Sequence, residues 1–203
     1  MSGLESDTIG GFNAFLAKQQ SESGACRLTT VLFDNEYELL HDRIDIEGIS
    51  PIGAEQYFVR GSTALLDAIG RSIRKIDSVQ NNTAADYRAA KVLFVITTDG
   101  MENSSREFDA AKIKGMIEQH KRDLGWEFIF LGANIDAVEV AGRFGIDAEH
   151  AQEFHNDSQG IATNFKALSD AVVALRTSPK KKLAKNWNAE IQADFAGRRR
   201  GKK

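Results

Sequence analysis

The stretch FVITTDGMENSS, residues 94–105, begins as an uninterrupted apolar run and then changes abruptly to threonine, aspartate and glycine. Such a run, closed by a glycine turn, predicts a strand that is buried on both faces and ends at Thr97, Thr98 and Asp99. In α/β sheets, ligands bind at the carboxyl ends of the strands, beside the helices that follow. Asp99 is therefore a candidate site residue.

Strand and helix patterns alternate on either side of this stretch. Strands are expected in five segments: CRLTTVLFDN (26–35), YELLHDRIDI (37–46), KVLFVITT (91–98), WEFIFLGAN (126–134) and AQEFHND (151–157), the last weak enough for a sheet edge. Apolar spacings of three and four predict helices over about 4–20, 61–76, 104–120, 136–145 and 161–175. We expect an α/β fold with a doubly wound, mostly parallel sheet, helices on both faces and one antiparallel edge hairpin, joined by Asn35-Glu36.

Composition narrows the class of protein. The chain has 203 residues, enough for one domain with a substantial core. Its longest apolar runs, such as Val92–Ile96, are far shorter than the roughly 20 residues that cross a bilayer, and its start resembles no secretory signal. Cys26 is the single cysteine, which excludes an internal disulfide. We expect a cytoplasmic protein without a membrane partner.

Charge is unevenly distributed along the chain. Residues 177–203 hold nine Lys or Arg and two Asp or Glu, a net charge of +7, whereas the rest carries −10. A basic segment of this kind can attract nucleic acid, and it can equally contact the acidic body of its own chain. We expect a domain over residues 1–176 and a basic, mobile tail over 177–203.

A second candidate residue, Thr63, stands after a Gly-Ser pair at the predicted start of a helix. A hydroxyl and a carboxylate are hard oxygen donors, which suit Mg²⁺, Mn²⁺ or Ca²⁺. The plainer interpretation is that Ser62 or Thr63 caps the helix and that Asp99-Gly100 only forms a turn. Spacing by itself leaves both interpretations open.

Three segments together resemble the von Willebrand factor A domain: VRGSTALLDAIG (59–70), VLFVITTDGMENSS (92–105) and WEFIFLGANIDA (126–137). The resemblance is to small intracellular bacterial members and covers about residues 3–176. It implies a divalent ion, usually Mg²⁺, held on top of the sheet at a metal-ion-dependent adhesion site. By this resemblance Thr63 and Asp99 are metal ligands, and an acidic side chain of a protein partner, or a water, completes the coordination.

The chain departs from that family in one respect. The family motif Asp-x-Ser-x-Ser, which supplies three further ligands, would stand directly before MSGLESDTIGGFNAFL. In the family's sheet order, 3-2-1-4-5-6, the strand carrying it is central. We expect this strand to be missing, the inner edges of the strands at 26–33 and 91–98 to be unpaired or forced together, and Mg²⁺ binding to be weak or absent. Two explanations remain open: an internal methionine has been taken as the start, or the chain no longer binds the metal.

These observations favour a protein-interaction module over an enzyme. A Mg²⁺-dependent hydrolase or phosphotransferase with Asp99 as ligand is one alternative, but the sequence has no Gly-rich phosphate loop and no Ser-His-Asp order. Nucleic-acid association through the basic tail is another. The sequence does not identify the partner.

Overall fold

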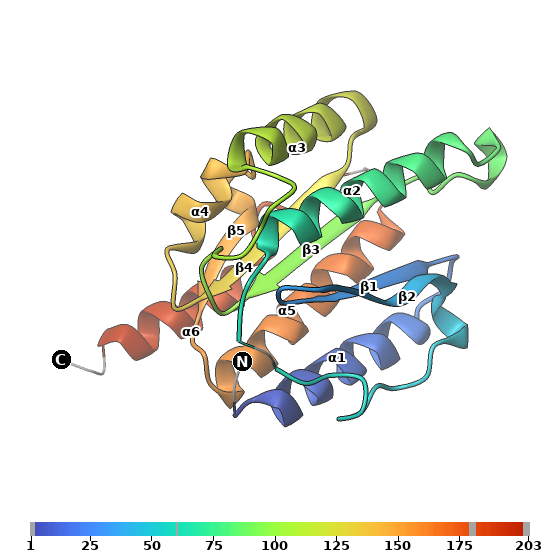
Figure 1. The fold of residues 1–203 in the computed structure, drawn as a ribbon. Helices are drawn as coiled ribbons and strands as arrows, with labels where there is room; N and C mark the ends of the chain where they lie inside the picture. Colours follow the sequence, from blue (N-terminus) through green and yellow to red (C-terminus); the bar gives the residue numbers. More distant parts are fainter. Residues whose placement is uncertain (1–2, 60, 179–181, 201–203) are drawn as a thin grey trace.

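A computed structural model describes residues 3–59, 61–178 and 182–200. Within them the chain forms a mixed α/β fold with two separate sheets (Figure 1). The strands are β1 (Arg27–Phe33), β2 (Tyr37–Asp45), β3 (Leu93–Thr98), β4 (Glu127–Ala133) and β5 (Ala151–Phe154). The helices are α1 (Glu5–Gln20), α2 (Leu65–Asn81), α3 (Ala110–Leu124), α4 (Ala137–Arg143), α5 (Ser158–Thr177) and α6 (Ala189–Arg200). No helix of the described part has both the length and the apolar character needed to cross a bilayer.

The larger sheet is parallel and has the order β3-β4-β5. Parallel neighbours need a crossover connection, and α3 supplies it between β3 and β4, as α4 does between β4 and β5. The carboxyl ends of all three strands therefore lie along one edge of the sheet. The three strands predicted in this part of the sequence are confirmed, with the weak one at the sheet edge as β5.

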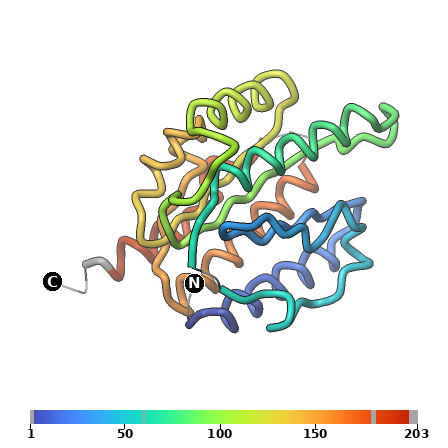
Figure 2. The backbone as a smooth tube through the Cα atoms, viewed as in Figure 1, coloured from blue at the N-terminus to red at the C-terminus, as the bar shows by residue number. Residues whose placement is uncertain are grey.

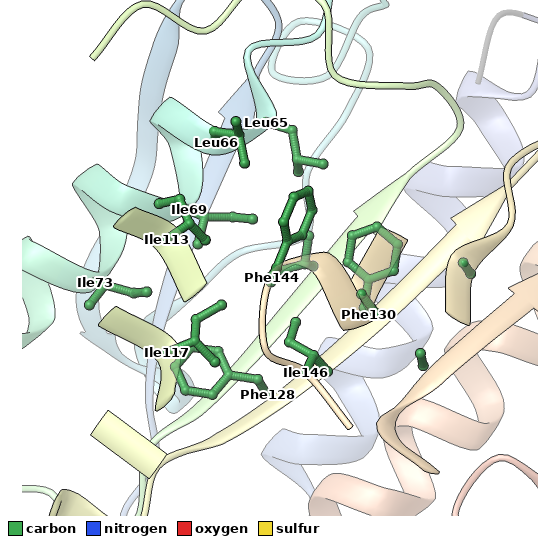
Figure 3. Packing of buried hydrophobic residues seen from close by; sticks show 14 of the residues in the cluster. Leu65, Leu66, Ile69, Ile73, Ile113, Ile117, Phe128, Phe130, Phe144 and Ile146 are labelled. Carbon is green, nitrogen blue, oxygen red and sulfur yellow. The ribbon is translucent and has the colours of Figure 1, made fainter. Parts of the chain in front are cut away.

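Strand β4 is apolar on both faces because helices lie against each face. Phe128 and Phe130 pack with side chains of α2, α3 and α4, including the labelled group around Leu65 in Figure 3. Ile129 and Leu131 point the other way and pack with side chains of α5. This alternation explains the continuous apolar run that predicted a buried strand.

The hairpin predicted before these strands is confirmed as β1 and β2, which pair antiparallel. The turn between them is closed by the side chain of Asp34, whose Oδ1 accepts from the N–H of Glu36 at 2.6 Å. Its expected place at the edge of a single sheet is wrong, because β1 and β2 form a two-stranded sheet of their own. In the described part of the chain, β1 and β3 are not paired with each other.

The chain after α5 differs from the expected mobile tail. Leu183, Trp187 and Ile191 are buried in the cluster that also contains Phe154 of β5. The indole Nε1–H of Trp187 donates to the carbonyl oxygen of Glu149 at 3.0 Å. Leu183 and Trp187 precede α6, whereas Ile191 lies in its first turn. Residues 182–200 therefore include a packed helix, whereas Lys180, Lys181, Lys202 and Lys203 lie outside the described residues.

Candidate functional site at the ends of β1 and β3

The two predicted site residues lie on the same rim of the molecule. Asp99 directly follows β3, and Thr63 lies two residues before α2. The Thr63 hydroxyl oxygen is 3.4 Å from the position that a Cβ on Gly100 would occupy. The structure thus brings the Thr63 hydroxyl against the residue that follows Asp99. Thr98 serves the turn instead, because its hydroxyl donates to the Gly100 carbonyl oxygen at 3.0 Å.

Hydrogen bonds from two neighbouring loops fix the backbone at Thr63. Its N–H donates to Oδ1 of Asn103 at 2.9 Å, and the N–H of Asn103 donates back to the Thr63 carbonyl oxygen at 3.0 Å. The next N–H, of Ala64, donates to the carbonyl oxygen of Asp34 at 2.5 Å. Three loops therefore meet here: the β1–β2 turn, the segment before α2 and the loop after β3.

The N-terminus of α2 is capped by the loop after β3. The expected cap from Ser62 or Thr63 is wrong, since the N-cap position is Ala64 and no side chain there makes a cap bond. Instead the Glu102 carboxylate accepts from the N–H of Leu66 at 2.9 Å and from the Ser105 hydroxyl at 2.7 Å. Helix α3 likewise begins later than predicted, at Ala110, with Asp109 as its cap.

Asp67, in the first turn of α2, holds the other end of the same loop. Asp67 is 7% exposed, and its carboxylate accepts from the N–H groups of Arg106, Glu107 and Phe108 at 2.9, 2.9 and 3.0 Å. Burial raises the pKa of Asp67, but these three donors outweigh burial and hold its pKa below the ordinary value. The sequence analysis missed this role; an acid in the first turn of a helix was the only local sign of it.

The pKa of Glu102 depends on the same two opposing effects, burial and hydrogen bonding. Burial raises its pKa, and the N–H groups of Ser105, Leu66 and Ser104 together with the Ser105 hydroxyl lower it below the ordinary value. Two carboxylates, Asp67 and Glu102, therefore tie the loop at residues 100–108 to α2. This fixes the position of the rim independently of any ligand.

We expect this arrangement to make stability depend on pH. A carboxyl group with a lowered folded-state pKa contributes stability above its unfolded pKa, about 4, and loses it as pH falls through the folded value. In Glu102→Gln the loss of stability between pH 5 and about 2 should be shallower than in the parent, and stability at pH 7 lower by about 1–2 kcal/mol. Urea unfolding across this pH range measures both, with the exposed Glu55→Gln as control. Parallel curves for Glu102→Gln and the parent would contradict the assignment.

Apolar side chains are exposed in the segments that precede Thr63 and follow Asp99. Phe58 and Val59 lie in the segment that leads to Thr63, and Met101 lies in the loop after Asp99; all three are exposed. Exposed apolar groups around a polar centre are typical of protein-interaction surfaces. Arg60, in the same segment, lies outside the described residues.

The oxygen donors at the rim are of the type that binds a divalent ion, but they are too few to surround one. Hydroxyl and carboxylate oxygens are ligands for Mg²⁺, Mn²⁺ and Ca²⁺. Within the described residues, however, no three His, Cys, Asp or Glu side chains gather as a metal-binding group. One hydroxyl and one carboxylate are fewer oxygen ligands than the octahedral set that Mg²⁺ takes.

Comparison with known proteins adds no relative: no protein-family model matches the chain, and no curated protein matches it. The class that the structure defines is a mixed α/β protein with a parallel three-stranded sheet and a separate antiparallel hairpin.

Proposed function

We propose that this chain is a cytoplasmic protein-interaction module of the von Willebrand factor A type, with a doubly wound sheet and a contact face at the carboxyl ends of β1 and β3. The observation that carries the proposal is the placement of the Thr63 hydroxyl against Gly100, beside Asp99. Exposed Met101, two residues after Asp99, supports a face that binds another protein.

In this proposal Thr63 and Asp99 would hold a divalent ion. The ion would supply a positive charge that attracts an acidic side chain of the partner. The chain itself holds the two ligand residues in place: Asn103 fixes the backbone of Thr63, and Glu102 fixes the loop after Asp99. A rigid rim lowers the entropy cost of binding because it need not become ordered on contact.

We do not extend the proposal to the two alternatives. No described contact favours a Mg²⁺-dependent hydrolase or phosphotransferase at Asp99. The other alternative is nucleic-acid association through the basic tail. In the structure the guanidinium of Arg198 contacts the carboxylates of Asp157 and Asp194, and its pKa is raised by both.

A titration with Mg²⁺ alone tests the face. We expect binding no tighter than about millimolar, because two protein ligands displace little of the ion's water. In ¹H–¹⁵N spectra the shifts should concentrate on the amides of Thr63, Gly100 and Met101. A version extended at its start by a strand ending in Asp-x-Ser-x-Ser should bind more tightly.

Variants separate this site from adventitious binding. Thr63→Ala and Asp99→Asn should each abolish the tighter binding of the extended version, whereas Thr83→Ala, a hydroxyl at the end of α2, should leave it unchanged. Tight Mg²⁺ binding that survives Thr63→Ala would mean that the ligands are misplaced. Shifts spread over unrelated acidic residues would also contradict the proposed face.

A further inference from the structure

The loop after β3 contains the one Asn-Ser pair of the sequence, Asn103-Ser104. In an unstructured chain, an asparagine that precedes glycine or serine loses its side-chain nitrogen as ammonia fastest. The small next residue leaves room for its backbone nitrogen to attack the side-chain amide. No asparagine of this chain precedes glycine, so Asn103 is the residue at which the sequence most favours this reaction.

The local structure of Asn103 favours attack on its side-chain amide. Residues 101–105 lie in neither helix nor strand, and Asn103 is exposed. Its Oδ1 accepts from the N–H of Thr63 at 2.9 Å and from the Ser104 hydroxyl at 2.5 Å. Two donors on a carbonyl oxygen stabilise the negative charge that forms there when a nucleophile adds to the carbon. The amide of Asn103 is therefore polarised for attack.

The attacking nitrogen, by contrast, is held by Glu102. The N–H of Ser104 donates to Oε1 of Glu102 at 2.9 Å, and the N–H of Ser105 donates to the same oxygen at 2.8 Å. Attack requires that the Ser104 nitrogen lose its proton, and an adjacent carboxylate opposes the negative charge that results. The hydrogen bond also keeps this nitrogen directed at Glu102 instead of at the Asn103 amide.

Glu102 is itself anchored to α2. Its Oε2 accepts from the N–H of Leu66 at 2.9 Å and from the Ser105 hydroxyl at 2.7 Å. Figure 2 shows the loop after β3 passing the start of α2. Burial raises the pKa of Glu102, but its hydrogen bonds lower that pKa below the ordinary value, so the carboxylate is ionised at neutral pH. The reaction therefore requires that the loop detach from α2.

We propose that Asn103 is a deamidation site in the rim, and that Glu102 sets its rate by holding the Ser104 nitrogen. A bond forms between that nitrogen and Cγ of Asn103, and the bond from Cγ to Nδ2 breaks. The proton of the Ser104 N–H leaves with Nδ2 as ammonia. Water then opens the resulting five-membered ring, which gives aspartate or isoaspartate at position 103.

Either product changes the rim. Aspartate places a negative charge beside Thr63, whose N–H now donates to the Asn103 amide oxygen. Isoaspartate adds a methylene to the backbone, so the two reciprocal bonds between Asn103 and Thr63 cannot both keep their geometry. Because ammonia is lost, closing the loop again does not restore the asparagine. A transient opening of the loop thus becomes a permanent change at the candidate site.

Peptide mapping by mass spectrometry on the full chain measures the reaction. It needs neither a metal nor a partner, so its outcome is independent of the proposed contact face. The reference is the synthetic peptide DGMENSSRE, residues 99–107, which is too short to fold. At neutral pH, Asn103 should react at least about tenfold more slowly in the chain than in the peptide, because a hydrogen bond to a charged acceptor must break first. Equal rates in chain and peptide would overturn the proposal.

Variants separate the role of the carboxylate from that of the fold. Glu102→Gln should bring the rate at Asn103 to within about threefold of that in the peptide, because the charge that opposes attack is gone. Asp136→Ala, which removes a helix cap in a different loop, should react at the parental rate. Circular dichroism checks that both variants fold, and the comparison of parent with peptide needs no variant. A folded Glu102→Gln that reacts at the parental rate refutes the role of Glu102, as does equal acceleration in Asp136→Ala.

Discussion

Trp187→Ala is expected to lower the free energy of unfolding by about 3–5 kcal/mol, the cost typical of deleting a large buried aromatic side chain. The indole is 8% exposed, belongs to the cluster with Ile191 and Phe154, and donates to the carbonyl oxygen of Glu149. The substitution removes the packing and leaves that carbonyl without its donor. Urea unfolding followed by circular dichroism at pH 7 measures the effect.

The matched control for this substitution is Lys185→Ala. The Lys185 side chain, two residues earlier in the same segment, is 89% exposed, so its loss should change stability by no more than about 0.5 kcal/mol. Removing residues 179–203 altogether should leave a chain close to unfolding, because domain stability is only about 5–15 kcal/mol. If Trp187→Ala behaves like the control, the segment is a solvated tail after all.

Asp67→Ala is expected to cost about 2–4 kcal/mol, because one buried carboxylate accepts three backbone N–H groups from the loop after β3. Water can reach Arg106 and Glu107 in the variant, but Phe108 is buried. Amide hydrogen exchange over residues 100–108 should accelerate more than in the rest of the chain. This separates local release of the loop from uniform destabilisation.

Asp136→Ala provides the comparison. Asp136 caps α4 through one bond to the N–H of Glu139, at 2.9 Å, so its loss should cost about 1 kcal/mol. Asp67→Asn keeps an acceptor oxygen and should fall between the two alanine variants. A cost for Asp67→Ala no greater than that for Asp136→Ala would show that the clamp does not fix the rim.

The elements of the larger sheet could be predicted because their signals are local. Phe128 to Leu131 are apolar without interruption, which indicates cover on both faces, and Asp99-Gly100 ends a buried run. The Asn35-Glu36 link predicted the hairpin from turn length. Each inference needs only the period of the side chains and the turn residues within a few positions.

The contacts that fix the candidate site are not local. Glu102 accepts from Leu66, which is 36 positions away in the sequence, and Asp67 accepts from Phe108, 41 positions away. Neither Glu102 nor Asp67 stands in a sequence pattern that indicates which residue it contacts. The cap predicted from nearby Ser62 or Thr63 was wrong because the Glu102 carboxylate, distant in the sequence, accepts from the N-terminus of α2 instead.

The amino-acid sequence alone indicated the five strands and the helices α1 to α5, apart from the later start of α3, and where Thr63 and Asp99 stand relative to them, since propensity and periodicity act over a few residues. Only the tertiary structure decided that β1 and β2 form their own sheet, that Trp187 and Ile191 enter the core, and that two carboxylates hold the rim. Those outcomes depend on which surfaces meet when the chain collapses. Hydrogen-bond partners that are far apart in the sequence become neighbours only when these surfaces come together.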